Sequence, residues 1–227
     1  MTYYRYRYSF GHGLTPVIKN LMIIMGAVFL VQQLLRMARI DIYIYFFDYF
    51  ALDPDKVWNK YFIWQLFTYI FLHGDFFHIL FNLFALWMFG GELESYWGSK
   101  KFIFYFFFCG IGAGICTVLF SPYPVIGASG SIYGILLAFA WFFPNRPILI
   151  YFLFPIPAKY MVIIFGLIEL FSSGSGTGGG IAHLTHLGGL VFGFFYMAYP
   201  TIRQKIRRKY YKRKWSQRGP NGGNYYH

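Results

Sequence analysis

Long apolar runs recur along almost the whole chain, separated by short polar or proline-rich segments. Each run is about 20 residues long, the length that a helix needs to cross the hydrocarbon core of a bilayer. The runs cover residues 17–36, 70–91, 102–120, 125–143, 156–172 and 181–199. We therefore predict an all-α membrane protein built as one bundle of six transmembrane helices.

The interruptions between the runs predict three further features. Residues 40–70 mix Tyr, Phe and Trp with Asp and Lys, so we expect a loop in the outer membrane interface, either as a gate for substrate or as a plain anchor. Residues 144–158 contain four prolines and predict a cytoplasmic turn. Residues 172–180 contain only Ser, Gly and Thr, which predicts a linker on the outer side, either a mobile cap or a simple connector.

Composition and charge support the membrane prediction. The chain is 57% hydrophobic and only 12% charged, which excludes an ordinary soluble domain. Its net charge is +12, but nine of the 20 basic residues lie between Arg203 and Arg218, directly after the last run. Retention of positive charge on the cytoplasmic side of the membrane explains this pattern better than binding to nucleic acid does. We predict cytoplasmic termini, with an N-terminal segment (1–16), a membrane domain (17–200) and a basic tail (201–227).

A serine among small residues opens the fourth run, in the sequence Gly127-Ala-Ser129-Gly130. Backbone N–H groups near a helix start lack intrahelical partners, and glycine lets another chain approach closely. Such a site is suited to binding an oxyanion. The same spacing of small residues also serves helix packing in membranes, so this motif alone does not identify a catalytic site.

The sixth run contains His186, and an ionisable side chain inside an apolar helix usually has a function. Pairs of glycines one turn apart would let the fourth and sixth helices approach closely, which would bring Ser129 and His186 together. A histidine beside a serine can act as general base and then as general acid. The glycines are Gly130 and Gly134 in the fourth run and Gly189 and Gly193 in the sixth.

The second run contains His78 and Asn82, which are four residues apart and therefore project from one face of a helix. Such a pair can donate hydrogen bonds to an oxyanion that develops during the reaction. The alternative is that these polar groups only bond to other helices to avoid being unsatisfied in lipid.

These three motifs together resemble the rhomboid family of intramembrane serine proteases. His-x-x-x-Asn, Gly-x-Ser-Gly and His-x-Gly-Gly-x-x-x-Gly occur in this order, and the resemblance covers about residues 15–200. It implies that Ser129 is the nucleophile and His186 its partner. It also implies an oxyanion hole formed by His78, Asn82 and the backbone N–H of Ser129. The supporting residues that it implies are Gly127, Gly130, Tyr133, Gly189 and Gly193.

Two other positions relate to the same family. Gly90, Gly91 and Glu94 resemble its G-G-x-x-E motif, in which the glutamate is structural. By contrast, Trp64-Gln65 stands where many members have Trp-Arg, so the internal contacts of the 40–70 loop do not carry over.

The resemblance implies an endopeptidase that cuts a peptide bond in or next to a transmembrane segment of its substrate. We expect transmembrane protein substrates and the lipid bilayer as partners, no cofactor, no metal and no nucleic acid. The expected location is the inner (plasma) membrane. The substrate and the oligomeric state stay open.

Two alternatives remain. A rhomboid-like protein that binds transmembrane segments without cutting them predicts a missing serine or histidine, and both are present. A metal transporter or metalloprotease would use the histidines, but no His-Glu-x-x-His motif exists, and Glu169 near the end of the fifth helix is poor provision for an ion relay. The histidines concerned are His73, His78, His183 and His186.

Overall fold

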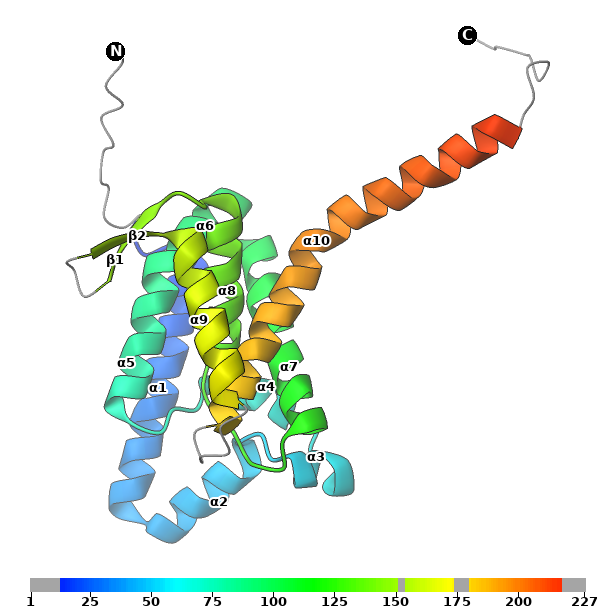
Figure 1. Ribbon diagram of the computed structural model, residues 1–227. Coiled ribbons are helices and arrows are strands. Elements are labelled where there is room, and N and C mark those ends of the chain that lie inside the picture. The colour runs from blue at the N-terminus through cyan, green and yellow to red at the C-terminus, as the bar shows by residue number, and fades with distance from the viewer. Residues whose placement is uncertain (1–12, 151–153, 174–179, 218–227) are drawn as a thin grey trace.

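The computed structural model describes residues 13–150, 154–173 and 180–217, and this part of the chain is almost entirely helical (Figure 1). The predicted 172–180 linker thus lies mostly outside the described residues. The elements, in chain order, are α1 (Pro16–Ala38), α2 (Ile40–Phe50), α3 (Pro54–Lys60), α4 (Gln65–Thr68), η1 (Tyr69–Phe71), α5 (Phe76–Ala85), η2 (Leu86–Gly90), α6 (Gly91–Trp97), α7 (Ser99–Phe120), α8 (Ser129–Phe142), β1 (Pro147–Ile150), β2 (Phe154–Pro157), α9 (Ala158–Ser173) and α10 (Gly180–Gln217).

Three helical segments of the described chain are long and apolar enough to cross a membrane. They are α1, the continuous helix Phe76–Trp97 formed by α5, η2 and α6, and α7. The apolar helix α8 is shorter. The chain is a multi-pass membrane protein, whereas the number of six crossings stays a prediction. The second segment begins at Phe76 rather than at residue 70, because Asp75 caps α5 by accepting from the backbone N–H of His78.

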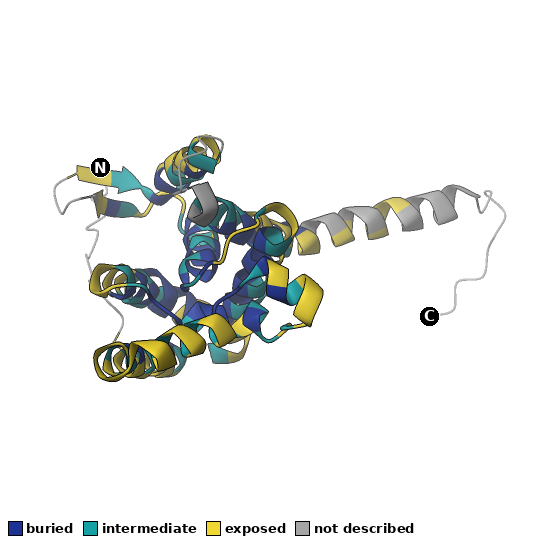
Figure 2. Ribbon diagram, turned by 90° about the horizontal axis from the view of Figure 1, so that it is seen from below, coloured by how far each residue is buried: buried dark blue, intermediate teal, exposed yellow. Residues whose placement is uncertain are grey.

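The outward faces of these helices are apolar. In Figure 2, exposed positions lie on the outer sides of the bundle and buried positions face its interior. On a soluble protein such continuous apolar exposure would mark an interaction surface, and in a bilayer it contacts lipid. The exposed apolar side chains of α1 and α9 include Ile23, Leu30, Leu34, Ile163, Leu167 and Phe171.

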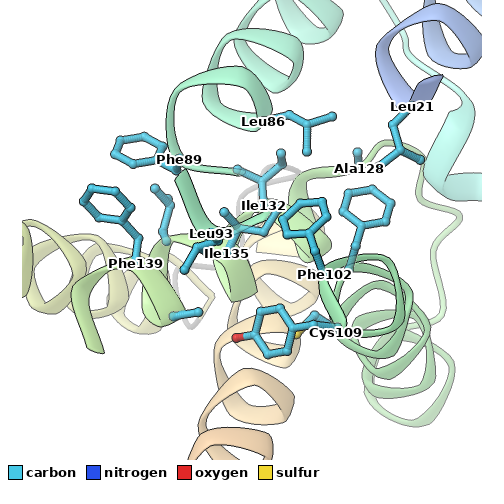
Figure 3. Close-up of a cluster of buried hydrophobic side chains, with 14 of the residues drawn as sticks. Leu21, Leu86, Phe89, Leu93, Phe102, Cys109, Ala128, Ile132, Ile135 and Phe139 are labelled. Atoms are coloured by element: carbon cyan, nitrogen blue, oxygen red, sulfur yellow. The ribbon is translucent and has the colours of Figure 1, made fainter. Parts of the chain in front are cut away.

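The core lies where α5, η2 and α6 meet α7 and α8 (Figure 3). Leu86, Phe102 and Ile135, one from each of these three parts, are fully buried. Close packing of this kind fixes the position of α8, the helix on which the predicted nucleophile lies.

Glu94 joins the end of α6 to the start of α1. Its carboxylate accepts hydrogen bonds from the backbone N–H groups of Val17 and Ile18, both at 3.0 Å, and from the hydroxyls of Thr15 and Ser99. A carboxylate at a helix N-terminus satisfies orphan N–H groups and interacts favourably with the helix dipole. This geometry agrees with the structural role that the family resemblance implies.

Residues 40–70 form short helices, α2 to α4 and η1, rather than a simple loop. Gln65 is fully buried and organises their junction. Its Oε1 accepts from the N–H of Asp53 at 3.0 Å, and its Nε2 donates to the carbonyls of Asp48 and Tyr49 at 3.1 and 3.2 Å. The Asp48 carbonyl also accepts from Nζ of Lys56 and the Tyr49 carbonyl from Nε1 of Trp64, so Gln65 shares this buried site with two further donors.

The predicted turn at 144–158 contains an antiparallel hairpin, in which β1 pairs with β2. The sequence missed these strands because prolines normally weaken a strand assignment. Pro147 and Pro157 pair at one end of the ladder, and short, edge-like strands tolerate proline. Arg146, next to the hairpin, pairs with Glu92 of α6.

Helix α10 continues beyond the apolar run through Pro200 to Gln217. Its second half projects away from the bundle (Figure 1). The predicted boundary between membrane domain and basic tail, at residues 200 and 201, thus falls inside a helix.

Candidate active site

Ser129 and His186 lie face to face. Ser129 is the first residue of α8, and His186 lies in the second turn of α10. The Oγ of Ser129 is 2.7 Å from Nε2 of His186, which is hydrogen-bond distance. Both side chains are half-buried. This distance meets the geometric requirement for a nucleophile and its general base.

Glycines allow α8 and α10 to approach this closely. A Cβ atom at Gly189 would lie 1.9 Å from the carbonyl oxygen of Gly130, and one at Gly193 would lie 3.3 Å from Cα of Gly134. A Cβ at Gly134 would in turn overlap Cys109 of α7. The backbones of the two helices are therefore in direct contact, and larger residues would separate Ser129 from His186.

The segment that precedes Ser129 is held by backbone hydrogen bonds. Val125 exchanges two hydrogen bonds with Leu52, at 2.9 and 3.1 Å, and the N–H of Gly127 donates to the carbonyl of Tyr69 at 2.9 Å. Gly127 has φ +111°, a backbone conformation that other residues rarely adopt. The 52–69 region thus fixes the entry into α8 and the position of its first residue.

His78 lies against this segment. A Cβ atom at Gly127 would be 2.6 Å from Nε2 of His78, so the imidazole contacts the backbone two residues before Ser129. Its Nδ1 accepts from the N–H of Gly74 at 3.4 Å. A neutral imidazole that accepts at Nδ1 carries its proton at Nε2. The geometry therefore presents an N–H donor toward the segment that leads to Ser129.

Asn82 is buried but makes a local contact. Its Nδ2 donates to the carbonyl of His78, one turn earlier, at 2.9 Å. The structure therefore does not bring the amide to the same point as the His78 ring. Its contribution to an oxyanion hole stays a prediction, one that requires the side chain to turn away from its own helix.

The ring of Tyr133 stacks on the ring of His186, with centroids 4.4 Å apart and planes inclined by 12°. Tyr133 lies one turn after Ser129 on α8. Its ring covers one face of the imidazole and restricts how the histidine can turn. This contact fits a supporting role for Tyr133.

Comparison with known proteins agrees with the motifs. The Rhomboid domain model matches residues 61–203, which is more than half of the chain. The chain belongs to the rhomboid family. It is 38% identical over 136 residues to the "Rhomboid protease GluP" of Bacillus subtilis, an alignment that covers 58% of this chain and 25% of that protein.

Two further rhomboid relatives match across much of the chain. The "Rhomboid protein 1, mitochondrial" of Saccharomyces cerevisiae is 28% identical over 178 residues, covering 74% of this chain and 50% of that protein. The "Rhomboid protease GlpG" of Salmonella paratyphi A is 30% identical over 152 residues, covering 65% and 52%. This rhomboid chain thus spans between a quarter and about half of the length of these relatives.

One residue beside the candidate site of this rhomboid chain was not predicted from the sequence. Glu169 of α9 is buried, and its carboxylate contacts the Tyr133 hydroxyl and Nδ1 of His183. Its Oε1 also lies 3.0 Å from Nδ1 of His186. From the sequence, Glu169 was read only as an acidic residue near the end of the fifth helix. The general rule that an intramembrane acidic residue is functional would have pointed to it.

The histidines do not form one metal site in the described part of this rhomboid chain. His73 and His78 lie near each other, with ring centroids 5.0 Å apart, on the side of the segment before α8. A separate group of Glu169, His183 and His186 has ligand atoms within 4.8 Å of one another. The four-histidine grouping considered from the sequence is therefore split.

Proposed function

We propose that this chain is an intramembrane serine endopeptidase that uses Ser129 and His186 as a catalytic pair. The substrate class is a membrane protein, cut in or next to a transmembrane segment. The observation that carries the proposal is the 2.7 Å contact between Ser129 Oγ and His186 Nε2 on two helices of a rhomboid membrane bundle. The protease names of two relatives support the same activity.

The reaction runs through an acyl-enzyme. Ser129 Oγ attacks the carbonyl carbon of the peptide bond while its proton passes to Nε2 of His186. The C–N bond then breaks, and the imidazolium returns the proton to the leaving amine. Water attacks the ester in a second round, His186 takes its proton, and the acyl group leaves as a carboxylic acid while Ser129 regains its hydrogen.

The oxyanion formed in each round needs hydrogen-bond donors. The backbone N–H of Ser129, at the start of α8, has no intrahelical partner. The Nε2 N–H of His78 is the second donor, and the amide of Asn82 is the third after rotation. Gly127 and Gly130 keep the surrounding backbone close enough for these groups to converge.

We assign six crossings, cytoplasmic termini and a plasma-membrane location. Figure 1 supports the orientation of the termini: the start of α1, α6 and the hairpin lie at the end from which the second half of α10 projects, and α2 and α3 lie at the opposite end. Residues 203–218 contain nine basic residues, whereas the opposite end carries four, Arg36, Arg39, Lys56 and Lys60, so the excess of Lys and Arg lies on the side that we assign to the cytoplasm. The acidic residues of the opposite end are Asp41, Asp48, Asp53 and Asp55.

Cleavage in liposomes tests the proposed activity. The purified chain is reconstituted with a panel of single-span membrane proteins, and fragments are analysed by mass spectrometry. We expect new chain ends within or beside the spans with wild type, and none with Ser129→Ala. Fragments that persist with Ser129→Ala would refute the assignment of the nucleophile.

The same experiment separates the alternative function. A rhomboid-like protein that only binds transmembrane segments would co-purify with panel members and leave all of them intact. Binding without cutting by wild type in every case would favour that function over proteolysis.

A further inference from the structure

Glu169 is a buried acidic residue in an otherwise apolar part of α9. The chain has eight acidic residues, and seven of them lie near the ends of the helices or in the segments between them. Glu169 is only 4% exposed and is preceded by the apolar sequence from Met161 to Ile168. A buried carboxylate in such a place is costly unless several donors satisfy it.

The donors around Glu169 all belong to the candidate active site. Oε1 accepts from the hydroxyl of Tyr133 and lies 3.0 Å from Nδ1 of His186. Oε2 contacts Nδ1 of His183, one turn before His186 on α10. The carboxylate therefore connects α9 with α8 and α10 at the level of the predicted catalytic histidine.

Nδ1 of His186 needs this partner. The nitrogen is buried, and among the described residues no acceptor is aligned well enough with it to count as a hydrogen bond. The nearest carboxylate oxygen, Oε1 of Glu169, is at hydrogen-bond distance but lies off the direction of the ring N–H. Hydrogen bonds of catalytic groups are often poorly aligned without substrate and tighten when it binds.

We infer that Glu169 is a positioning residue that turns the predicted Ser129–His186 pair into a Ser-His-Glu arrangement. This inference rests on the proposed function. A carboxylate at Nδ1 keeps the ring proton on that nitrogen, so Nε2 stays free to accept the proton of Ser129. After the transfer, the same carboxylate stabilises the imidazolium through its negative charge.

Glu169 also orients Tyr133, whose ring covers His186. The tyrosine hydroxyl donates to the carboxylate while its ring stacks at 4.4 Å on the imidazole. The Glu169 carboxylate thus restrains the His186 ring in two ways. It lies at the Nδ1 edge of the imidazole, and it holds the Tyr133 ring that stacks on the imidazole face. A role only in helix packing does not require the carboxylate to face the one unpaired nitrogen of His186.

Metal binding is the main rival for this cluster, since Glu169, His183 and His186 lie within ligand distance of one another. A metal would take Nδ1 of His186 as a ligand and occupy the carboxylate. The present contacts instead engage both carboxylate oxygens with Tyr133 and the two histidines. Chelation of the purified protein separates these two uses of the cluster.

The tautomer of His186 tests the inference on the wild-type protein, and a variant is needed only to assign the signals. Histidine is labelled with ¹⁵N, and the His186 signals are assigned by their loss in His186→Ala. In the neutral form of the ring, we expect the proton on Nδ1 and a bare Nε2. A ring that carries its proton on Nε2 would overturn the inference.

The second test compares Glu169→Gln with Glu92→Gln, which makes the same chemical change where the carboxylate contacts Arg146 and no active-site residue. The measured quantity is the rate of labelling of Ser129 by a fluorophosphonate probe. We expect at least about a tenfold fall for Glu169→Gln in protein that still unfolds cooperatively, and a wild-type rate for Glu92→Gln. Equal rates in Glu169→Gln and wild type would refute the positioning role.

These outcomes are distinguishable from failure of the proposed function. A folded wild type that does not label contradicts the activated serine itself, whatever the tautomer of His186. Labelling in wild type that is unaffected by Glu169→Gln contradicts only the inference about Glu169. Labelling lost on treatment with EDTA would assign the cluster to a metal and overturn the inference, whereas retained labelling supports it.

Discussion

Gly189 lies so close to Gly130 that a Cβ atom at position 189 would be 1.9 Å from the carbonyl oxygen of Gly130. The two residues belong to α10 and α8, which also present His186 and Ser129. The distance between the predicted catalytic side chains therefore depends on the absence of a side chain one turn away from them.

We predict that Gly189→Ala separates α8 from α10. The expected cost is about 1–3 kcal/mol of stability, because the overlapping atom is backbone that cannot move aside cheaply. Labelling of Ser129 by a fluorophosphonate should fall together with the melting temperature. The matched control is Gly166→Ala on α9, where a Cβ atom would meet only Leu190 at an ordinary 3.5 Å. Similar behaviour of the two variants would contradict the close-packing explanation.

Glu94→Gln should destabilise the start of α1. The charged carboxylate accepts from Thr15, Val17, Ile18 and Ser99, and its loss should cost on the order of 2 kcal/mol because hydrogen bonds to a charged group are the stronger ones. Thermal unfolding in detergent measures the change. Glu92→Gln, whose partner Arg146 is half-exposed, should melt close to wild type. A larger loss in Glu92→Gln than in Glu94→Gln would disprove this assignment.

Gln65→Ala should loosen the junction of α2, α3 and α4 while leaving the rest of the bundle intact. The variant leaves the N–H of Asp53 without its acceptor and removes one donor each from the carbonyls of Asp48 and Tyr49, which keep Lys56 and Trp64 as donors. Hydrogen exchange should therefore rise locally in residues 40–68 and stay unchanged in α7. The control is Asn59→Ala, which removes only an exposed hydrogen bond to Asp55. Unchanged exchange in Gln65→Ala would show that packing alone orders the segment.

His78→Ala should slow peptide-bond cleavage by about 100- to 1000-fold, the usual effect of removing an oxyanion donor. Because His78 contacts the segment before Ser129 rather than Ser129 itself, folding and the Ser129–His186 contact should persist. The measurement is the turnover of a substrate found in the liposome panel. Asn82→Ala provides a comparison: an equal loss would mean that the amide turns toward the oxyanion, and a wild-type rate would mean that it serves only its helix. Full activity in His78→Ala would exclude its predicted role.

The apolar pattern predicted the presence of the helices better than the residues at which they begin and end. Helix α1 follows the first run closely, because a bilayer-length run determines both the presence and the length of a helix. The second helix starts later than predicted. The apolar run includes residues before the cap at Asp75, among them Leu72, which is buried but lies outside the helix. Hydropathy does not report where a capping side chain stops or starts a helix.

Motif spacing predicted which residues would come together, but not every contact. The spacing of glycines on two helices is a local property that the sequence shows, and the backbones of α8 and α10 are in contact at these glycines. Asn82 shows the limit: position i+4 puts it on the face of His78, yet its amide bonds to its own helix. Glu169 shows another limit, because its contacts with His183 and His186 depend on how α9 packs against α10, which no local pattern encodes.

The most direct test of the central claim is labelling of the folded, detergent-solubilised protein by a fluorophosphonate, with the adduct located by peptide mapping. Wild type, Ser129→Ala and His186→Ala are compared with Ser131→Ala, a control two residues along α8 whose buried hydroxyl has no hydrogen-bond partner in the described structure. We expect an adduct on Ser129 in wild type and in Ser131→Ala, and none in the other two variants. An adduct elsewhere, or labelling that survives His186→Ala at the wild-type rate, would contradict the Ser129–His186 pair.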